Sequence, residues 1–160
     1  MIKEFVPKDF VIPKSLKSNL FLLEVLSPEV AEIDYDAVMS SRVRLRSVFG
    51  KSTEWPSDNL SLEDNINDLE KHKKEFEERV AFAYTVLDLS RENCLGCVYI
   101  DPGKKSNFDC EIYLWVRDSH INLDSELYNT VKFWIESNWP FKQIVFPGRE
   151  ISWDKWNELQ

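Results

Sequence analysis

Three apolar runs of strand length follow one another between Val80 and Arg117, and short polar turns separate them. The runs cover residues 80–87, 94–100 and 108–117, and they are rich in the β-branched and aromatic side chains that are typical of strands. Connections this short cannot hold the crossover that parallel neighbours need. The sequence therefore predicts three adjacent antiparallel strands, and the rest of the chain must pack around them.

Two helical segments precede these strands. A short apolar strand at 20–26 stops at Ser27-Pro28-Glu29, where a capping serine and a proline suited to the first turn begin a helix that extends, with a break, to Leu45. Ser61-Leu62-Glu63-Asp64 resembles a capping box. It opens a second helix whose predicted buried stripe is Leu62, Ile66, Leu69, Phe76 and Val80.

A third helix is expected after the strands, from about Leu123 to Asn138, and Pro140 ends it. Residues 143–146 then form a last buried strand, and Ser152 caps a short terminal helix. A helix between two strands of one sheet implies a parallel βαβ crossover. The predicted fold class is therefore α/β (α+β), a mixed, mostly antiparallel twisted sheet flanked by helices.

The chain has the length of a single domain, which we expect to span residues 1–160, with residues 1–19 as an extended N-terminal arm. Its net charge of −8 disfavours nucleic acid and anionic membranes as partners. No apolar segment approaches the roughly 20 residues that cross a bilayer. Because the first residues also lack the pattern of a signal peptide, we expect a cytoplasmic protein.

The order of these elements resembles the fold of the Gcn5-related N-acetyltransferases (GNAT family) from about Leu20 to Ser152. Leu95-Gly96-Cys97-Val98-Tyr99-Ile100 looks like the third strand of that family, and Glu111-Ile112-Tyr113-Leu114-Trp115-Val116-Arg117 looks like its fourth strand. The resemblance implies an acetyltransferase-like protein that transfers an acyl group from acetyl-CoA to an amine. It also implies that the main chain at Trp115, Val116 and Arg117 meets the pantetheine arm of coenzyme A.

The loop after this fourth strand departs from the family pattern. Where the family has Arg or Gln, two residues, Gly, one residue and then Gly or Ala, the corresponding positions are Ile121, Asp124 and Glu126. Glycines let backbone N–H groups approach a diphosphate at a helix N-terminus, whereas carboxylates in the first turn repel it. The resemblance is therefore to a divergent member, and one with a truncated C-terminus, because the two further strands common in the family do not follow residue 146.

Glu111 is the leading candidate for a catalytic residue, because similar acetyltransferases use a carboxylate on this strand to accept the proton of the amine. Strand alternation places it on the same face as Tyr113, and a merely solvated face is the competing interpretation. His120, in the loop after the strand, is a second candidate, although a loop histidine is usually solvated. His72 is expected on the wet side of its helix.

The three cysteines are expected to be free core thiols that bind no metal. Cys94-Leu95-Gly96-Cys97 has the C-x-x-C spacing, but a zinc site needs a second pair of ligands and only Cys110 remains. Residues three apart on a strand also face opposite sides of the sheet, which disfavours a shared ligand.

Two functional hypotheses remain open. In the first, an acetyltransferase-like enzyme binds an acyl-CoA or another small ligand. In the second, a non-catalytic binding or assembly module retains the fold and has lost CoA binding. A homodimer contact through aromatic residues of the C-terminal third is compatible with either hypothesis: Trp134, Trp139, Trp153 and Trp156.

Overall fold

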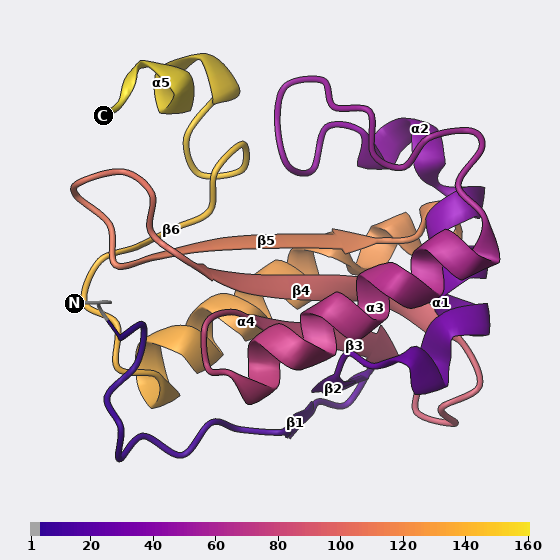
Figure 1. Ribbon diagram of the computed structural model, residues 1–160, viewed down its shortest axis with the longest axis horizontal. Coiled ribbons are helices and arrows are strands. Elements are labelled where there is room, and N and C mark those ends of the chain that lie inside the picture. Colours follow the sequence, from indigo (N-terminus) through magenta and orange to yellow (C-terminus); the bar gives the residue numbers. More distant parts are fainter. Residues whose placement is uncertain (1–3) are drawn as a thin grey trace.

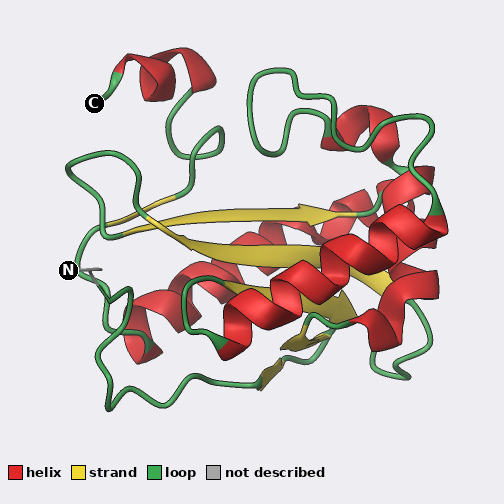
Figure 2. Cartoon of the chain, in the orientation of Figure 1, coloured by secondary structure: helices red, strands yellow, loops and turns green. Residues whose placement is uncertain are grey.

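The structure, a computed structural model that describes residues 4–160, contains one six-stranded sheet with helices on both faces (Figures 1 and 2). The strands follow the order of the sequence across the sheet: β1 (Ser15–Lys17), β2 (Leu22–Val25), β3 (Phe82–Leu87), β4 (Cys94–Pro102), β5 (Cys110–Val116) and β6 (Ile144–Val145). Neighbouring strands are antiparallel, except that β5 and β6 are parallel. The predicted mixed sheet and its βαβ crossover are confirmed.

The helical elements also follow the predicted order: η1 (Pro28–Val30), α1 (Ala31–Ser40), α2 (Arg42–Leu45), α3 (Leu62–Glu77), η2 (Asp118–Leu123), α4 (Asp124–Asn138) and α5 (Trp153–Glu158). The three predicted caps are present, at Ser27, Ser61 and Ser152. At Ser61 the box is reciprocal, because Asp64 N donates to Ser61 Oγ at 3.0 Å and Ser61 N donates to Asp64 Oδ2 at 3.2 Å. These bonds satisfy N–H groups that have no partner within the helix.

The described residues of the N-terminal arm include one short strand. Ser15–Lys17 pairs with β2 at the edge of the sheet. The reason is that Leu16 packs against the core and holds this segment beside the sheet. Residues 1–3 of the predicted arm lie outside the described part of the chain.

The second helix ends earlier than its apolar stripe indicated. Val80, predicted to be buried, is 45% exposed. Arg79 adopts a positive φ of 62° immediately after the helix and turns the chain toward β3. The stripe therefore stops at Phe76, because the chain no longer follows the helical period beyond that residue.

Each face of the sheet carries its own apolar core. In Figure 1, α1 and α3 lie in front of the sheet and α4 lies behind it. Phe21, Phe82 and Leu127 belong to the core on the α4 side, whereas Val38 and Trp115 belong to the core under α1 and α3. The sheet thus has two covered faces, and ligands can reach it only at an edge or between the covering helices.

Cys94, Cys97 and Cys110 are buried free thiols. Contrary to the expectation of opposite faces, Cys94 and Cys97 lie in the same core cluster. A register shift places Gly96 opposite Val86 but Cys94 opposite Leu87, so β4 holds one extra residue at that point and its alternation is interrupted. No group of three or more His, Cys, Asp or Glu side chains within residues 4–160 is placed to hold a metal ion.

The edge of β5 is the feature that positions the site. β6 pairs with β5 only through Cys110 and Glu111, so within residues 4–160 no strand pairs with the edge of β5 away from β4 between Ile112 and Val116. The chain after β6 turns at Gly148, whose φ is +80°, and continues into α5. No helix in the described part of the chain is long and apolar enough to cross a membrane.

Replacing Ser61 by alanine should lower the free energy of unfolding by about 1 kcal/mol, because it removes the serine half of the capping box. Urea denaturation followed by tryptophan fluorescence measures this loss. Ser57→Ala is the matched control, since Ser57 is exposed and its side chain makes no hydrogen bond within residues 4–160. Equal losses in the two variants would contradict the assignment of the cap.

Candidate functional site

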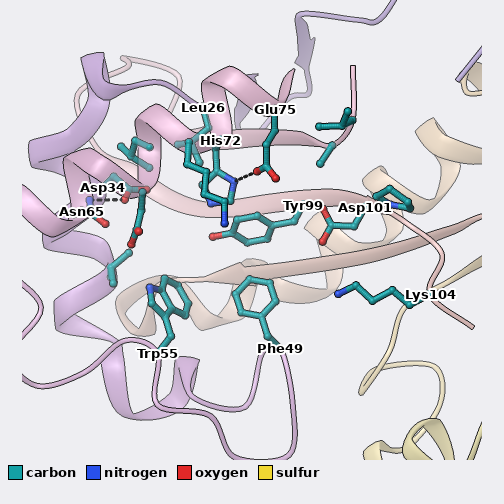
Figure 3. Close-up of a pocket in the computed structure, with 17 residues that line it drawn as sticks. Leu26, Asp34, Phe49, Trp55, Asn65, His72, Glu75, Tyr99, Asp101 and Lys104 are labelled. Atoms are coloured by element: carbon teal, nitrogen blue, oxygen red, sulfur yellow. Dashed lines mark hydrogen bonds and ion pairs between the residues drawn. The ribbon is translucent and has the colours of Figure 1, made fainter. Parts of the chain in front are cut away.

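A cavity of about 530 Å³ lies between α1, α3, β4 and the loop that joins α2 to α3 (Figure 3). The rings of Phe49, Trp55 and Tyr99 form part of its wall. Phe49 packs edge-on against Tyr99 and Trp55, with ring centroids 4.9 and 5.5 Å apart. Loop and sheet thus present a continuous aromatic surface to the cavity.

One end of the cavity is formed by a buried carboxylate on α1. Asp34 follows Ala31 by three residues and precedes Val38 by four, so it lies on the buried face of that helix and is only 3% exposed. Asn65 Nδ2 on α3 donates to Asp34 Oδ2 at 2.9 Å. Burial, with a smaller effect of the neighbouring Asp68, raises the pKa of Asp34 to about 6, and the bond from Asn65 opposes this rise.

A second group of carboxylates lies near the opposite end. Asp101 and Glu111 face each other in the β4–β5 ladder, and Glu111 is 0% exposed. The Tyr113 hydroxyl donates to Glu111 Oε1 at 3.2 Å, and the Lys104 ammonium lies 3.7 Å from the same oxygen. Burial raises the pKa of Asp101 to about 6; Lys104 opposes the rise, while Glu111 and Glu75 add to it. The interpretation of Glu111 as part of a solvated face is therefore wrong.

His72 lines the cavity instead of the wet side of α3 (Figure 3). Its Nδ1 lies 3.6 Å from Glu75 Oε1, and its ring centroid lies 5.5 Å from that of Tyr99. Burial lowers the pKa of His72 below 6.5, although Asp68 opposes this effect, so the imidazole is neutral at pH 7. The sequence held a signal for this position, since His72 follows Leu69 by three residues and precedes Phe76 by four.

A second hollow, a cleft of about 260 Å³, lies along the unpaired edge of β5 and is lined by Ile112 to Trp115. The Trp153 ring stacks parallel to Tyr113, with centroids 6.5 Å apart, and Trp153 Nε1 donates to Ser47 O at 3.2 Å. Tyr113 also packs against Phe49, with centroids 5.2 Å apart. Since Phe49 lines the cavity and Tyr113 lines the cleft, the two hollows adjoin at this contact.

The cleft also reaches the start of α4, where the predicted first-turn carboxylates Asp124 and Glu126 are confirmed. The charge of Asp124 is paired, because Arg149 Nη1 and Nη2 donate to its two carboxylate oxygens at 2.6 and 3.0 Å. Arg44 also lines the cleft and donates to Asp118 and to the carbonyl oxygen of Val116. This end of the cleft is therefore less acidic than the sequence of the loop implied.

The remaining predicted site residues lie at the far end of β5 from Glu111. Trp115 and Val116 are both 1% exposed, so a ligand could meet only their main chain. The Arg117 side chain donates to Cys94 O at 3.1 Å and to Asp36 at 2.8 Å. His120 Nδ1 lies 2.9 Å from Ser119 Oγ in η2. Because a strand rises about 3.3 Å per residue, Glu111 and the end of β5 are separated by roughly 16 Å, and the structure does not bring His120 to Glu111.

The predicted C-terminal aromatic residues are mostly internal. Trp134, Trp139 and Trp156 are 5–6% exposed and pack within this chain. Only Trp153 of the four is partly exposed. A dimer contact through these residues would therefore depend on Trp153.

No protein-family model matches the chain, and no curated protein matches it by sequence. Solved acetyltransferases share its fold. The ribosomal-protein-S5-alanine acetyltransferase of Vibrio fischeri is 14% identical, with a TM-score of 0.59 over 76% of this chain and 66% of that protein. The microcin C7 self immunity acetyltransferase MccE, solved with acetyl-CoA and AMP, is 17% identical, with a TM-score of 0.59 over 78% of this chain and 66% of that protein.

A third structure, of a probable acetyltransferase, is 13% identical and has a TM-score of 0.63 over 81% of this chain and 71% of that protein. The chain therefore spans just under two thirds of the length of the first two proteins. The fold is that of the GNAT acetyltransferases, as the order of elements in the sequence predicted.

Replacing Asp34 by asparagine should remove a pH-dependent destabilisation. The folded protein holds a proton on Asp34 up to a pKa of about 6, whereas the unfolded chain releases it near 3.8, so wild-type stability falls as pH rises through this window. Urea denaturation at several pH values should show the variant gaining up to about 3 kcal/mol on the wild type between pH 4 and pH 7. A difference that did not change with pH would contradict the buried, proton-holding state of this carboxylate.

Proposed function

We propose that this protein is an acetyltransferase-like enzyme that moves an acyl group from an acyl-CoA to an amine held in the cavity of Figure 3. The observation that carries the proposal is the unpaired edge of β5, which opens on a cleft that adjoins the buried Glu111 and Tyr113 pair. A strand edge without a neighbour offers main-chain donors and acceptors to an extended ligand. The three free cysteines are compatible with the expected cytoplasmic location.

The cleft has groups that fit an acyl-CoA. The edge from Ile112 to Val116, which includes the main chain of Trp115 and Val116 predicted for this role, would bind the pantetheine arm, and Arg117 follows it. In place of the missing glycines, the guanidinium groups of Arg44 and Arg149 would meet the diphosphate. Each must first exchange its aspartate partner, Asp118 or Asp124, for the ligand, and Arg44 must also release the carbonyl oxygen of Val116. When bound, acetyl-CoA supplies an activated thioester carbonyl.

The residues of the chain would prepare the amine for reaction. Glu111, fixed by the Tyr113 hydroxyl, would hold the ammonium form and accept its proton. The neutral imidazole of His72, which lines the cavity, offers a second proton acceptor. His120 lies at the other end of β5 and would contribute to the loop near the cofactor rather than to proton transfer.

One observation favours the second hypothesis, a non-catalytic binding module. Asp124 and Arg149 pair with each other at the N-terminus of α4, and both residues line the cleft where a diphosphate would bind. Each charge is therefore already neutralised without a ligand. If the pair does not open, the fold would retain a cavity for a small ligand without using acyl-CoA.

Isothermal titration with acetyl-CoA and CoA separates the two functions. We expect binding in the micromolar range that is common for enzyme substrates. Asp124→Asn should tighten it several-fold, because it frees Arg149 from its ion pair and removes a charge that repels phosphate. Glu126→Gln changes an exposed first-turn residue that makes no ion pair within residues 4–160; it is the control and should have a smaller effect. An absence of heat up to roughly millimolar ligand, in the wild type and in Asp124→Asn alike, would exclude the enzyme.

Glu111→Gln should lower kcat by about a hundredfold or more while leaving the affinity for CoA unchanged, because it removes the proton acceptor without changing the cleft. Release of the CoA thiol from acetyl-CoA in the presence of primary amines measures turnover. Glu70→Gln, an exposed change on α3, should retain wild-type turnover. A Glu111→Gln enzyme as fast as the control would remove Glu111 from the mechanism.

A further inference from the structure

The cavity carries negative charge near both of its ends. Asp34 lies near Cys94, Cys97 and Tyr99 of β4, since its charge raises the pKa of each of these groups. Asp101 lies farther along the same strand, and its charged neighbours are instead Lys104, Glu111 and Glu75. In Figure 3 the two aspartates flank Tyr99. Asp101 follows Cys97 by four residues along β4, a rise of roughly 13 Å, so the two carboxylates are on the order of 10 Å apart.

The wall between these carboxylates is aromatic. Phe49, Trp55 and Tyr99 lie between Asp34 and Asp101 (Figure 3). Such rings bind methylene groups through apolar contact and attract nearby cations through their faces. A ligand that crosses from one carboxylate to the other would therefore have an apolar middle.

Asp34 lacks the partners that a buried carboxylate needs. It is 97% covered, yet the only hydrogen bond to its carboxylate within residues 4–160 comes from Asn65 to Oδ2. Its other oxygen, Oδ1, accepts no hydrogen bond in that part of the chain, and the residue lines the cavity. Burying a carboxylate without full pairing is costly, so a cationic ligand at this end would relieve an existing cost.

The other end already accommodates an ammonium group. Lys104 Nζ lies 3.7 Å from Glu111 Oε1, although the Lys104 side chain is 76% exposed. The lysine side chain is free to move into solvent, but Glu111 is buried and needs a cation in its place once Lys104 leaves. The ammonium group of a ligand could take its place beside Glu111 and Asp101.

The charge of the lining favours a ligand with two positive charges. The cavity is lined by four carboxylates, those of Asp34, Asp68, Glu75 and Asp101, against two lysines, Lys71 and Lys104. His72 does not offset the difference, since burial keeps it neutral at pH 7.

We propose that the cavity binds an aliphatic diamine or polyamine, with one ammonium group at Asp34, the other at Glu111 and Asp101, and the methylene chain against Phe49, Trp55 and Tyr99. As a statement about the acceptor substrate, this rests on the proposed function. The amine at Glu111 gives up a proton to that carboxylate, and its lone pair attacks the thioester carbonyl. A C–N bond forms as the C–S bond breaks, the nitrogen gives its second proton to the leaving thiolate, and Glu111 later releases the first proton to solvent. The products are a monoacylated diamine and CoA.

Isothermal titration without any acyl-CoA tests the binding itself, at pH 7.5, with hexamethylenediamine and with hexylamine, which has the same chain and one amino group. The diamine should bind at least about tenfold tighter, because only the diamine reaches both ends. Asp34→Asn should weaken the binding of the diamine about tenfold and leave the affinity for hexylamine unchanged, since the single ammonium of hexylamine binds at Glu111. Glu32→Gln, an exposed change on α1, is the matched control and should alter neither affinity.

Equal affinities for the two amines, or an Asp34→Asn variant that weakens both equally, would overturn the proposal. Circular dichroism of the variant confirms that it is folded. The two proposals fail separately. If the protein prefers the diamine but releases no thiol from acetyl-CoA, the diamine site stands and the proposed acyl transfer is wrong. If it acylates hexylamine as readily as the diamine, the acyl transfer stands and the diamine site is wrong.

Discussion

The separation of β5 from β6 after Glu111 is the constraint on which the candidate site depends. Two residues of parallel pairing hold the strands together, and then the chain turns away through Gly148. A longer β6 would satisfy the β5 edge with main-chain bonds and close the cleft. Because pairing ends at Glu111, the last paired position is also the one whose carboxylate lies beside the cleft and close to Lys104 of the cavity. The early end of β6 thus leaves the edge of β5 free and places that free edge next to the buried Glu111.

The sequence predicted most of the fold because its signals were local. The capping box at Ser61 and the end of the helix before Pro140 each depend on side chains a few residues apart in the sequence. Glu111 was also accessible to this reasoning, since alternation along one strand sets its face. The errors arose where the period was interrupted. Arg79 with its positive φ exposed Val80, and the extra residue in β4 moved Cys94 to the face of Cys97.

The cavity could not be predicted in the same way, because it depends on contacts between distant segments. Asp34 and Asn65 are 31 residues apart, and Lys104 reaches Glu111 only because a strand reverses between them. A polar residue on the buried face of a helix was the available signal, and both Asp34 and His72 provide one. From the sequence alone, however, each could equally be interpreted as an exposed residue, because the elements that pack against it are distant in the sequence.

The first turn of α4, which has carboxylates and no glycine, is compatible either with diphosphate binding or with its exclusion. An unpaired Asp124 there would repel a diphosphate, whereas the ion pair with Arg149 cancels that charge and places a guanidinium group at the cleft. The side chains of this bidentate pair remain 30% and 27% exposed, so a ligand with several phosphate oxygens can reach Arg149 and compete with the carboxylate for it. The pair therefore does not by itself exclude the cofactor. Whether Arg149 exchanges Asp124 for a phosphate group, rather than the absence of glycine, decides whether the cleft binds a diphosphate.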